Sequence, residues 1–416
     1  MTAKKRKRRS RKKTINPKNL LLSLVLSLTS VTIIIFFYYL SLGEKPSRAE
    51  KTLSTPIYEE IHATNSGFLY EVTKIENAIY ESLYKSGIPE DNILFLSVCP
   101  RNEKRNQWDF TELWIKLPNR ESALHLTQNI GSALSLSQPN IRYKVENVSK
   151  SEKVLHVYAL DLYSHRIRMA WEAYEKPTPN QFPRIALIID DFGYDPYIID
   201  DFLKLDLPLA FSILPRAPYT QQIAVKAHRR GHELMLHLPM EPNDYPNVDP
   251  GPGALLTKMS MRKIRTTLRS HLEEIPGIRG VNNHMGSYFT SKRDKMAVVM
   301  GELKRRDLFY IDSRTTTETV AHELAQKMGV PVASRSVFLD NDLSSKAIGF
   351  QMERLLGIAR HSGAAIGIGH PNEETLKLLR KYIKKLKTRV NVVHVSQLIG
   401  QVPEISRMNF WERPSG

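Results

Sequence analysis

The feature that most constrains the fold is an alternation of short apolar runs with longer amphipathic stretches between residues 185 and 401. Such alternation is typical of parallel strands joined by helical crossovers. The apolar runs have the length and composition of strands. They are 185–189, 209–214, 233–238, 280–283, 309–311, 330–333, 364–368 and 390–395.

Helical spacing fills the intervals between these runs. It is found at 220–230, 262–274, 292–305, 319–328, 344–361 and 373–386. Seven or eight strand–helix units within about 215 residues suit a closed barrel better than an open sheet. The sequence therefore predicts an α/β fold, a (β/α)7–8 barrel over 183–402, followed by a C-terminal tail at 403–416.

A different pattern precedes the barrel. Residues 176–183, KPTPNQFP, contain three prolines and mark a domain boundary, because proline breaks most elements that cross it. The preceding stretch, 58–175, is predicted to form a small α+β domain. Its expected elements are a helix near 58–84, a strand at 108–117, a helix at 120–134 and one or two strands within 154–170. No cluster of ligands or nucleophiles converges there, so we expect a structural or partner-binding role.

The N-terminus combines a basic tail with a long uncharged run. Residues 1–19 carry ten Lys or Arg and no acidic residue, which accounts for most of the formal charge of +17. Residues 20–42 contain no charge, and a helix of this length exceeds the roughly 30 Å of a membrane's hydrocarbon layer. Positive charge before a span keeps the N-terminus in the cytoplasm. We therefore predict a single transmembrane helix at 20–42, a linker at 43–57, and a remainder that is periplasmic or extracellular.

Two other interpretations fit parts of this N-terminus. A cleaved signal peptide has a shorter apolar core, about 7 to 15 residues, and SLGEKPSR at 41–48 offers no clear cleavage site. A nucleic-acid-binding tail accounts for the basic residues, but the tail abuts the apolar run and carries no interleaved aromatic residues. Cys99 is the only cysteine, so no intramolecular disulfide forms. Cysteine usage therefore neither supports nor excludes an oxidising compartment.

Acidic and imidazole side chains follow several of the predicted strands. A β/α barrel places its working groups at the C-terminal ends of its strands. Each residue alone has an ordinary explanation, because an Asp pair often starts a turn and a lone His more often packs in a core. Their agreement across separate strands favours one shared site. They are Asp190, Asp191, His237, His284, Asp312 and His370.

The motifs around these residues resemble those of the divergent polysaccharide deacetylases. The motifs are DDFG at 190–193, HLPMEP at 237–242, NNHMGS at 282–287, DSRT at 312–315 and IGIGHP at 366–371. This family belongs with the NodB-like carbohydrate esterases, which remove N- or O-acetyl groups from cell-wall sugars. The resemblance covers roughly half the chain. It implies a distorted β/α barrel with a divalent metal, usually zinc, at the rim.

The resemblance also implies roles for individual residues. Asp191 matches the metal-binding Asp of the superfamily, and Asp190 matches the general base. His237 matches the first His of a His-x-x-x-His metal motif, but the second position holds Glu241, which departs from that pattern. His284 can supply the missing imidazole. The predicted metal ligands are then Asp191, His237 and His284, which leaves a position open for water.

Further residues are expected on the same rim. His370 matches the late-motif His that protonates the leaving group, and Asp312 and Arg314 are expected to orient His370 or Asp190, or to pair with each other. Arg216 either clamps an anionic group or caps the following helix. The proline-rich loop 239–253 is either a wall of the substrate cleft or an ordinary surface loop. The predicted substrate-binding residues are Arg216, Glu241, Asn283 and Arg314.

Together these features predict a membrane-anchored, metal-dependent hydrolase that deacetylates a cell-envelope polysaccharide or a related amino sugar outside the cytoplasm. The expected partners are that glycan and, through the N-terminal helix, the membrane; no nucleic acid is expected, and protein partners stay open. The alternative is an inactive barrel that binds a glycan or a partner, which the departure at Glu241 favours.

Overall fold

The computed structural model describes residues 67–103, 106–136, 139–171 and 182–400, which all lie within one compact unit, Tyr58–Gly416. The predicted basic tail, transmembrane helix, linker and C-terminal tail lie outside the described residues, as does most of the predicted boundary at 176–183. Within the described part of the chain, no helix combines the length and the hydropathy that crossing a membrane requires.

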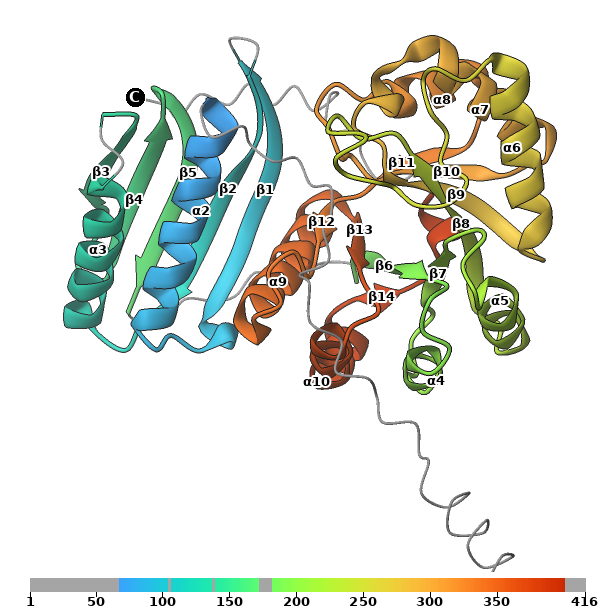
Figure 1. Ribbon diagram of the computed structural model, residues 1–416. Coiled ribbons are helices and arrows are strands. Elements are labelled where there is room, and N and C mark those ends of the chain that lie inside the picture. The colour runs from blue at the N-terminus through green and yellow to red at the C-terminus, as the bar shows by residue number, and fades with distance from the viewer. Residues whose placement is uncertain (1–66, 104–105, 137–138, 172–181, 401–416) are drawn as a thin grey trace, which may run out of the picture. The chain divides into compact units, whose positions relative to one another are not determined.

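The first part of the described chain forms a five-stranded sheet of order β1-β2-β5-β4-β3, in which only β2 and β5 are parallel neighbours (Figure 1). Helices α2 and α3 pack against it around an apolar core. The elements are α2 (Phe68–Lys85), η1 (Glu90–Asn92), β1 (Ile93–Glu103), β2 (Asn106–Lys116), α3 (Arg120–Ser135), β3 (Ile141–Asn147), β4 (Glu152–Ala159) and β5 (Leu162–Ala170). Strands β1 and β3 were not predicted. Along β3, apolar Ile141, Tyr143 and Val145 alternate with charged residues, but only Ile141 is buried.

The second part forms a curled parallel sheet of order β11-β10-β9-β8-β7-β6-β13-β12, with β14 paired to β6. Helices follow most strands and lie outside the curl (Figure 1). The strands are β6 (Arg184–Phe192), β7 (Ala210–Ile213), β8 (Glu233–Met240), β9 (Ile278–Met285), β10 (Phe309–Asp312), β11 (Val332–Ser334), β12 (Val337–Phe338), β13 (Ala364–Gly369) and β14 (Asn391–Val392). The helices are α4 (Ile198–Phe202), α5 (Thr220–Arg229), α6 (Met261–Glu274), η2 (Phe289–Ser291), α7 (Arg293–Arg305), α8 (Ala321–Met328), α9 (Ser345–Ser362), α10 (Glu373–Arg389) and η3 (Val395–Leu398).

The prediction of parallel strands with helical crossovers is confirmed, and the curled sheet fits a β/α barrel. Two details differ. The predicted strand at 390–395 shortens to Asn391–Val392, because the chain turns into the η3 helix. The short strand β12 was not predicted, because two residues carry no periodicity.

A short connection joins the two edge strands of the curled sheet. Arg335 and Ser336 lie between β11 and β12. The Arg335 N–H donates to the Asp312 carbonyl at the end of β10, and the Ser336 N–H donates to the Ile366 carbonyl of β13, at 3.0 and 2.8 Å. Since buried backbone groups must find partners, these bonds hold β10 and β13 on either side of one interior.

The packing between β9 and β10 gives a stability prediction. Gly280 pairs with Phe309 in the parallel register, and a Cβ at Gly280 would lie 2.1 Å from the Phe309 ring. Gly280→Ala should therefore destabilise the fold by about 1–3 kcal/mol, because the ring has to move within a packed interior. Gly301→Ala is the matched control: it lies within α7, its Cβ would meet nothing nearer than 3.9 Å, and it should stabilise by about 0.5–1 kcal/mol. Thermal and urea unfolding measure both changes, and an unchanged stability of Gly280→Ala would contradict this register.

Candidate metal centre

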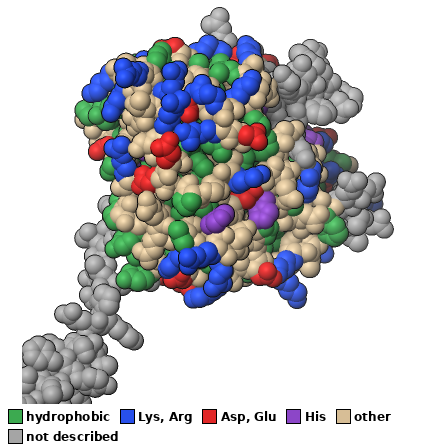
Figure 2. Space-filling model, turned by 90° about the vertical axis from the view of Figure 1, so that its right-hand side faces the viewer, with side chains coloured by type: hydrophobic (Ala, Val, Ile, Leu, Met, Phe, Trp, Pro, Cys, Tyr) green, Lys and Arg blue, Asp and Glu red, His purple; other side chains and the backbone are tan. Residues whose placement is uncertain are grey.

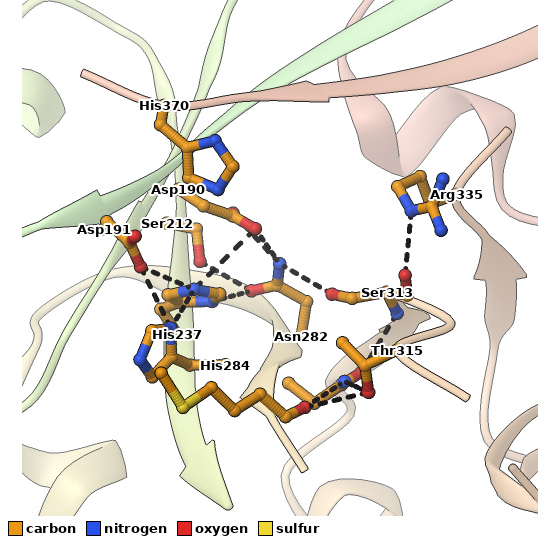
Figure 3. A network of polar contacts seen from close by, with 12 residues as sticks. Asp190, Asp191, Ser212, His237, Asn282, His284, Ser313, Thr315, Arg335 and His370 are labelled. Carbon is orange, nitrogen blue, oxygen red and sulfur yellow. Dashed lines mark hydrogen bonds and ion pairs between the residues drawn. The ribbon is translucent and has the colours of Figure 1, made fainter. Parts of the chain in front are cut away.

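Strand alternation decides which side chains enter the curled sheet. Successive residues of a strand face opposite sides. On β6, Ala186 and Ile188 belong to the apolar cluster inside the curl, whereas Leu187 belongs to the cluster that contains the surrounding helices. The inward series ends in polar residues at the C-terminal ends of the strands (Figure 3). They are Asp190 on β6, Ser212 on β7, His237 on β8, Asn282 and His284 on β9, Ser313 after β10 and His370 after β13.

Asp191 departs from this alternation. The register between β6 and β7 shifts between Ile189 and Phe192, and Asp191 has a φ of 57°. A left-handed φ is costly for a residue with a side chain and is often found at functional sites. The irregularity turns Asp191 toward the pocket, so the neighbouring carboxylates of Asp190 and Asp191 reach the same site (Figure 3).

Three side-chain atoms face a common point. Asp191 Oδ1 lies 3.0 Å from His237 Nε2 and 3.0 Å from His284 Nδ1, and these two nitrogens are 3.2 Å apart. Tetrahedral zinc with bonds of about 2.0–2.2 Å places neighbouring ligand atoms roughly 3.3 Å apart. The triangle therefore has nearly the size of one face of a zinc tetrahedron. The fourth corner would remain for water or substrate.

Hydrogen bonding alone does not account for this arrangement. Asp191 Oδ1 is buried and has no well-directed hydrogen-bond partner among the described residues, although both histidine nitrogens are at 3.0 Å. Burial favours the neutral acid, but His284 and His237 override it and hold the pKa of Asp191 well below its usual value. An ionised carboxylate oxygen without a directed donor, facing two imidazole nitrogens, fits a divalent cation. This donor set suits zinc and also other first-row ions.

Asp190 lies beside the three ligand atoms. Its Oδ2 is 3.7 Å from His237 Nε2, and both of its oxygens accept hydrogen bonds from Asn282 Nδ2, at 3.0 and 2.9 Å. Burial raises the pKa of Asp190, against the opposing effects of His237 and His370. A buried carboxylate with a raised pKa is a suitable proton acceptor near neutral pH.

His370 is paired with a carboxylate that the sequence analysis did not identify. Its Nδ1 donates to Asp340 Oδ1 at 2.8 Å, and Asp340 Oδ2 accepts from the His370 N–H, Asn372 Nδ2 and Thr375 Oγ1. Burial opposes the charged imidazole, but Asp340 outweighs it and raises the pKa of His370 to about 9. His370 is therefore protonated at neutral pH and can act as a general acid.

Two predicted site residues have other duties. Asp312 continues the outward-facing side of β10 with Tyr310; its carboxylate accepts from the Arg314 N–H and from Thr319 Oγ1, and Asp340 takes the place beside His370. Asn283 faces away from His284 on β9. Its amide bonds the Tyr310 hydroxyl, the Ser313 N–H and the Met285 carbonyl, and it is 1% exposed. The predicted catalytic role of Asp312 and substrate contact of Asn283 are corrected accordingly.

The other predicted rim residues lie in the loops that follow β7, β8 and β10. Glu241 does not join the three ligand atoms, because its carboxylate accepts the Thr257 N–H and closes the loop after β8. The Arg216 N–H donates to the Glu274 carboxylate of α6 at 3.0 Å. Arg314 contributes its backbone to the turn after β10, where its N–H donates to Asp312 Oδ1. Contacts of Glu241, Arg216 and Arg314 with substrate stay predictions.

The sequence analysis missed two residues of the site, Asn282 and Asp340. The sequence contained a signal for Asn282. Asn282 and His284 are two positions apart on β9, so period-two alternation places them on the same face and Asn283 on the other. Asp340 had no comparable signal, because it follows the two-residue strand β12 and its partner His370 is 30 positions away.

The pocket is open to solvent on one side. The side chains of Asp191 and His284 keep 21% and 15% of their surface exposed, whereas His237 keeps 3%. Figure 2 shows histidine side chains at the surface of the face turned to the viewer, with Lys and Arg gathered above them. Solvent therefore reaches Asp191 and His284, while His237 stays shielded.

Comparison with known proteins agrees with this geometry. Residues 187–399 match the divergent polysaccharide deacetylases, and the chain belongs to this family. The uncharacterized protein YibQ of Escherichia coli K12 is 36% identical over 218 residues, which are 52% of this chain and 68% of YibQ. An uncharacterized protein of Haemophilus influenzae KW20 is 30% identical over 217 residues, 52% of this chain and 76% of its own length. The crystal structure of uncharacterized ATU2773 from Agrobacterium tumefaciens C58 is 25% identical, with a TM-score of 0.50, and covers 54% of this chain and 92% of its own.

The pairing of His370 with Asp340 gives a pH prediction. If hydrolysis needs the protonated imidazole, activity is present below the His370 pKa of about 9 and is lost as the pH rises through it. Asp340→Asn removes the charge that raises this pKa, so the alkaline limb of kcat/KM should move to lower pH. Asp342→Asn removes an exposed charge from the same loop and should leave the limb in place. A limb that does not move in Asp340→Asn would show that another group titrates there.

Proposed function

We propose that this protein is a divalent-metal hydrolase, with zinc as the most suitable ion, that removes acetyl groups from amino sugars of a cell-envelope polysaccharide. The observation that carries the proposal is the triangle of Asp191 Oδ1, His237 Nε2 and His284 Nδ1, with sides of 3.0, 3.0 and 3.2 Å. Membership of the polysaccharide deacetylase family supports the type of reaction.

The residues around the triangle suit amide hydrolysis. A divalent ion held there would polarise the acyl oxygen and lower the pKa of water to about 7. Asp190, buried beside the ligands, would accept the proton of the attacking water. His370, protonated through its pairing with Asp340, would donate a proton to the departing sugar amine. The proposed proton acceptor and proton donor thus come from different strands, Asp190 from β6 and His370 from the end of β13.

The departure at Glu241 is compatible with this function. Glu241 occupies the place of the second motif histidine, yet the third ligand atom is supplied by His284 from the neighbouring strand. Pro239 on β8 pairs with His284 on β9, so the imidazole arrives beside the end of the same strand that carries His237. The ligand count of a catalytic zinc site is therefore complete without a second histidine on the β8 loop.

Substitution of the ligands tests this function. Asp191→Asn and His284→Ala should each weaken zinc binding by more than about 100-fold, since loss of second-shell partners alone costs 10–100-fold. Both should abolish acetate release from acetylated amino-sugar oligomers. His228→Ala, which changes an exposed histidine of α5, should leave zinc binding and acetate release unchanged. Chelator competition and acetate assays measure the two quantities.

The outcomes separate the enzyme from a binding protein. Stoichiometric zinc together with acetate release supports the hydrolase. A wild-type protein without zinc that leaves these oligomers intact but retains them would instead support the inactive, glycan-binding barrel.

We also propose that residues 20–42 anchor the chain in a membrane and that the catalytic part lies outside the cytoplasm. The uncharged length of this run and the basic residues before it support this. The full chain should remain in the membrane fraction after an alkaline wash, whereas a chain lacking 1–42 should be released. Protease added from the outer side should digest the catalytic part. If protease digests the catalytic part only when it has access to the cytoplasmic side, the proposed orientation is wrong.

A further inference from the structure

Asn282 connects the proton acceptor to a metal ligand through a single buried side chain. Its Nδ2 donates to both oxygens of Asp190, at 3.0 and 2.9 Å. Its Oδ1 lies 3.0 Å from His237 Nδ1 and 2.5 Å from Ser212 Oγ (Figure 3). All four side chains are at most 3% exposed, so protein groups have to satisfy one another there.

The neighbours determine which way the amide points. If the amide were reversed, its oxygen would face both oxygens of Asp190, and a protonated Asp190 could donate from only one of them. The NH2 group therefore faces Asp190. The amide oxygen then faces Ser212 and His237, and each of these must donate to it.

The orientation of the amide in turn decides the state of His237. An imidazole that donates from Nδ1 carries its proton there, and when neutral it presents the lone pair of Nε2. That nitrogen is the one 3.0 Å from Asp191 Oδ1 and 3.2 Å from His284 Nδ1. The reversed tautomer would place a proton at the point where the three ligand atoms converge.

We propose that Asn282 is a positioning residue with two simultaneous roles: it selects the Nδ1–H form of His237, so that Nε2 is free to bind the metal, and it holds both oxygens of Asp190 beside the reacting position. The inference rests on the proposed hydrolase function. It concerns the side chain that joins the metal ligand His237 to the proton acceptor Asp190. An aspartate at this position could perform only the first role, and a leucine could perform neither.

Two substitutions at the same buried position separate these roles. Asn282→Leu leaves the His237 Nδ1 without an acceptor, so zinc affinity should fall about 10–100-fold. Asn282→Asp still accepts from His237 and Ser212, so zinc affinity should stay within about threefold of wild type or tighten. Its carboxylate has no N–H for Asp190 and places like charge beside it, so hydrolysis should fall about 100- to 10,000-fold.

The measurement is zinc titration against a chelating competitor, with acetate release assayed on the same samples and thermal unfolding confirming that each variant folds. A general loss of stability would lower the zinc affinity of both variants alike. It would therefore not produce the expected difference in zinc affinity between Asn282→Leu and Asn282→Asp. In the zinc-loaded wild type, the ¹⁵N spectrum of His237 should show a protonated Nδ1 and a zinc-bound Nε2. Should Asn282→Leu not fold, Asn282→Asp and this spectrum still test the proposal.

The results distinguish this inference from the proposed function. Wild-type zinc affinity in Asn282→Leu, an affinity loss in Asn282→Asp equal to that of Asn282→Leu, or zinc on Nδ1 of His237 would overturn the first role. Wild-type hydrolysis by Asn282→Asp would overturn the second. A wild-type protein that binds zinc without releasing acetate refutes the hydrolase, while the affinity ratio and the spectrum still decide how Asn282 acts on His237.

Discussion

The site depends on one geometric constraint, the alternation of side chains along parallel strands that curl around a common interior. Inward positions are apolar along most of each strand and become polar only at the C-terminal ends. Polar side chains from several strands therefore meet where water is largely excluded. In such surroundings an unpaired polar atom is costly, so most of these groups are joined by hydrogen bonds, and Asp191 Oδ1 is the exception among them.

Asp191 shows what is gained by departing from the alternation. With regular pleating, Asp190 and Asp191 would face opposite sides of β6. The Asp191 carboxylate would then point toward the surrounding helices and away from the pocket. The register shift and the left-handed backbone at Asp191 bring both to the pocket. The strained conformation is held by the surrounding sheet, as is common where a backbone irregularity serves a binding site.

The two histidine–carboxylate groups differ in how many hydrogen bonds the carboxylate accepts. Asp340 accepts hydrogen bonds from a backbone N–H and three side chains. These bonds stabilise the ionised carboxylate, which in turn favours the protonated form of His370. Asp191 Oδ1 faces two imidazole nitrogens without a well-directed hydrogen bond, so it is suited to a cation. Similar residue types thus acquire different chemistry from their hydrogen-bond partners alone.

The sequence by itself determined the parallel strand–helix pattern and the rim residues Asp190, Asp191, His237, His284 and His370, because hydrophobic periodicity and strand ends are local properties of the chain. It assigned Asp312 and Asn283 to the site, but both face outward. Strand alternation indicates this, because Asp312 shares a face with Tyr310 and Asn283 lies on the face opposite His284. Only the tertiary structure decided that Asp340 partners His370 and that Asn282 joins Asp190 to His237. Those pairings link residues 30 to 92 positions apart, and such contacts arise from the curling of the sheet, which no local pattern encodes.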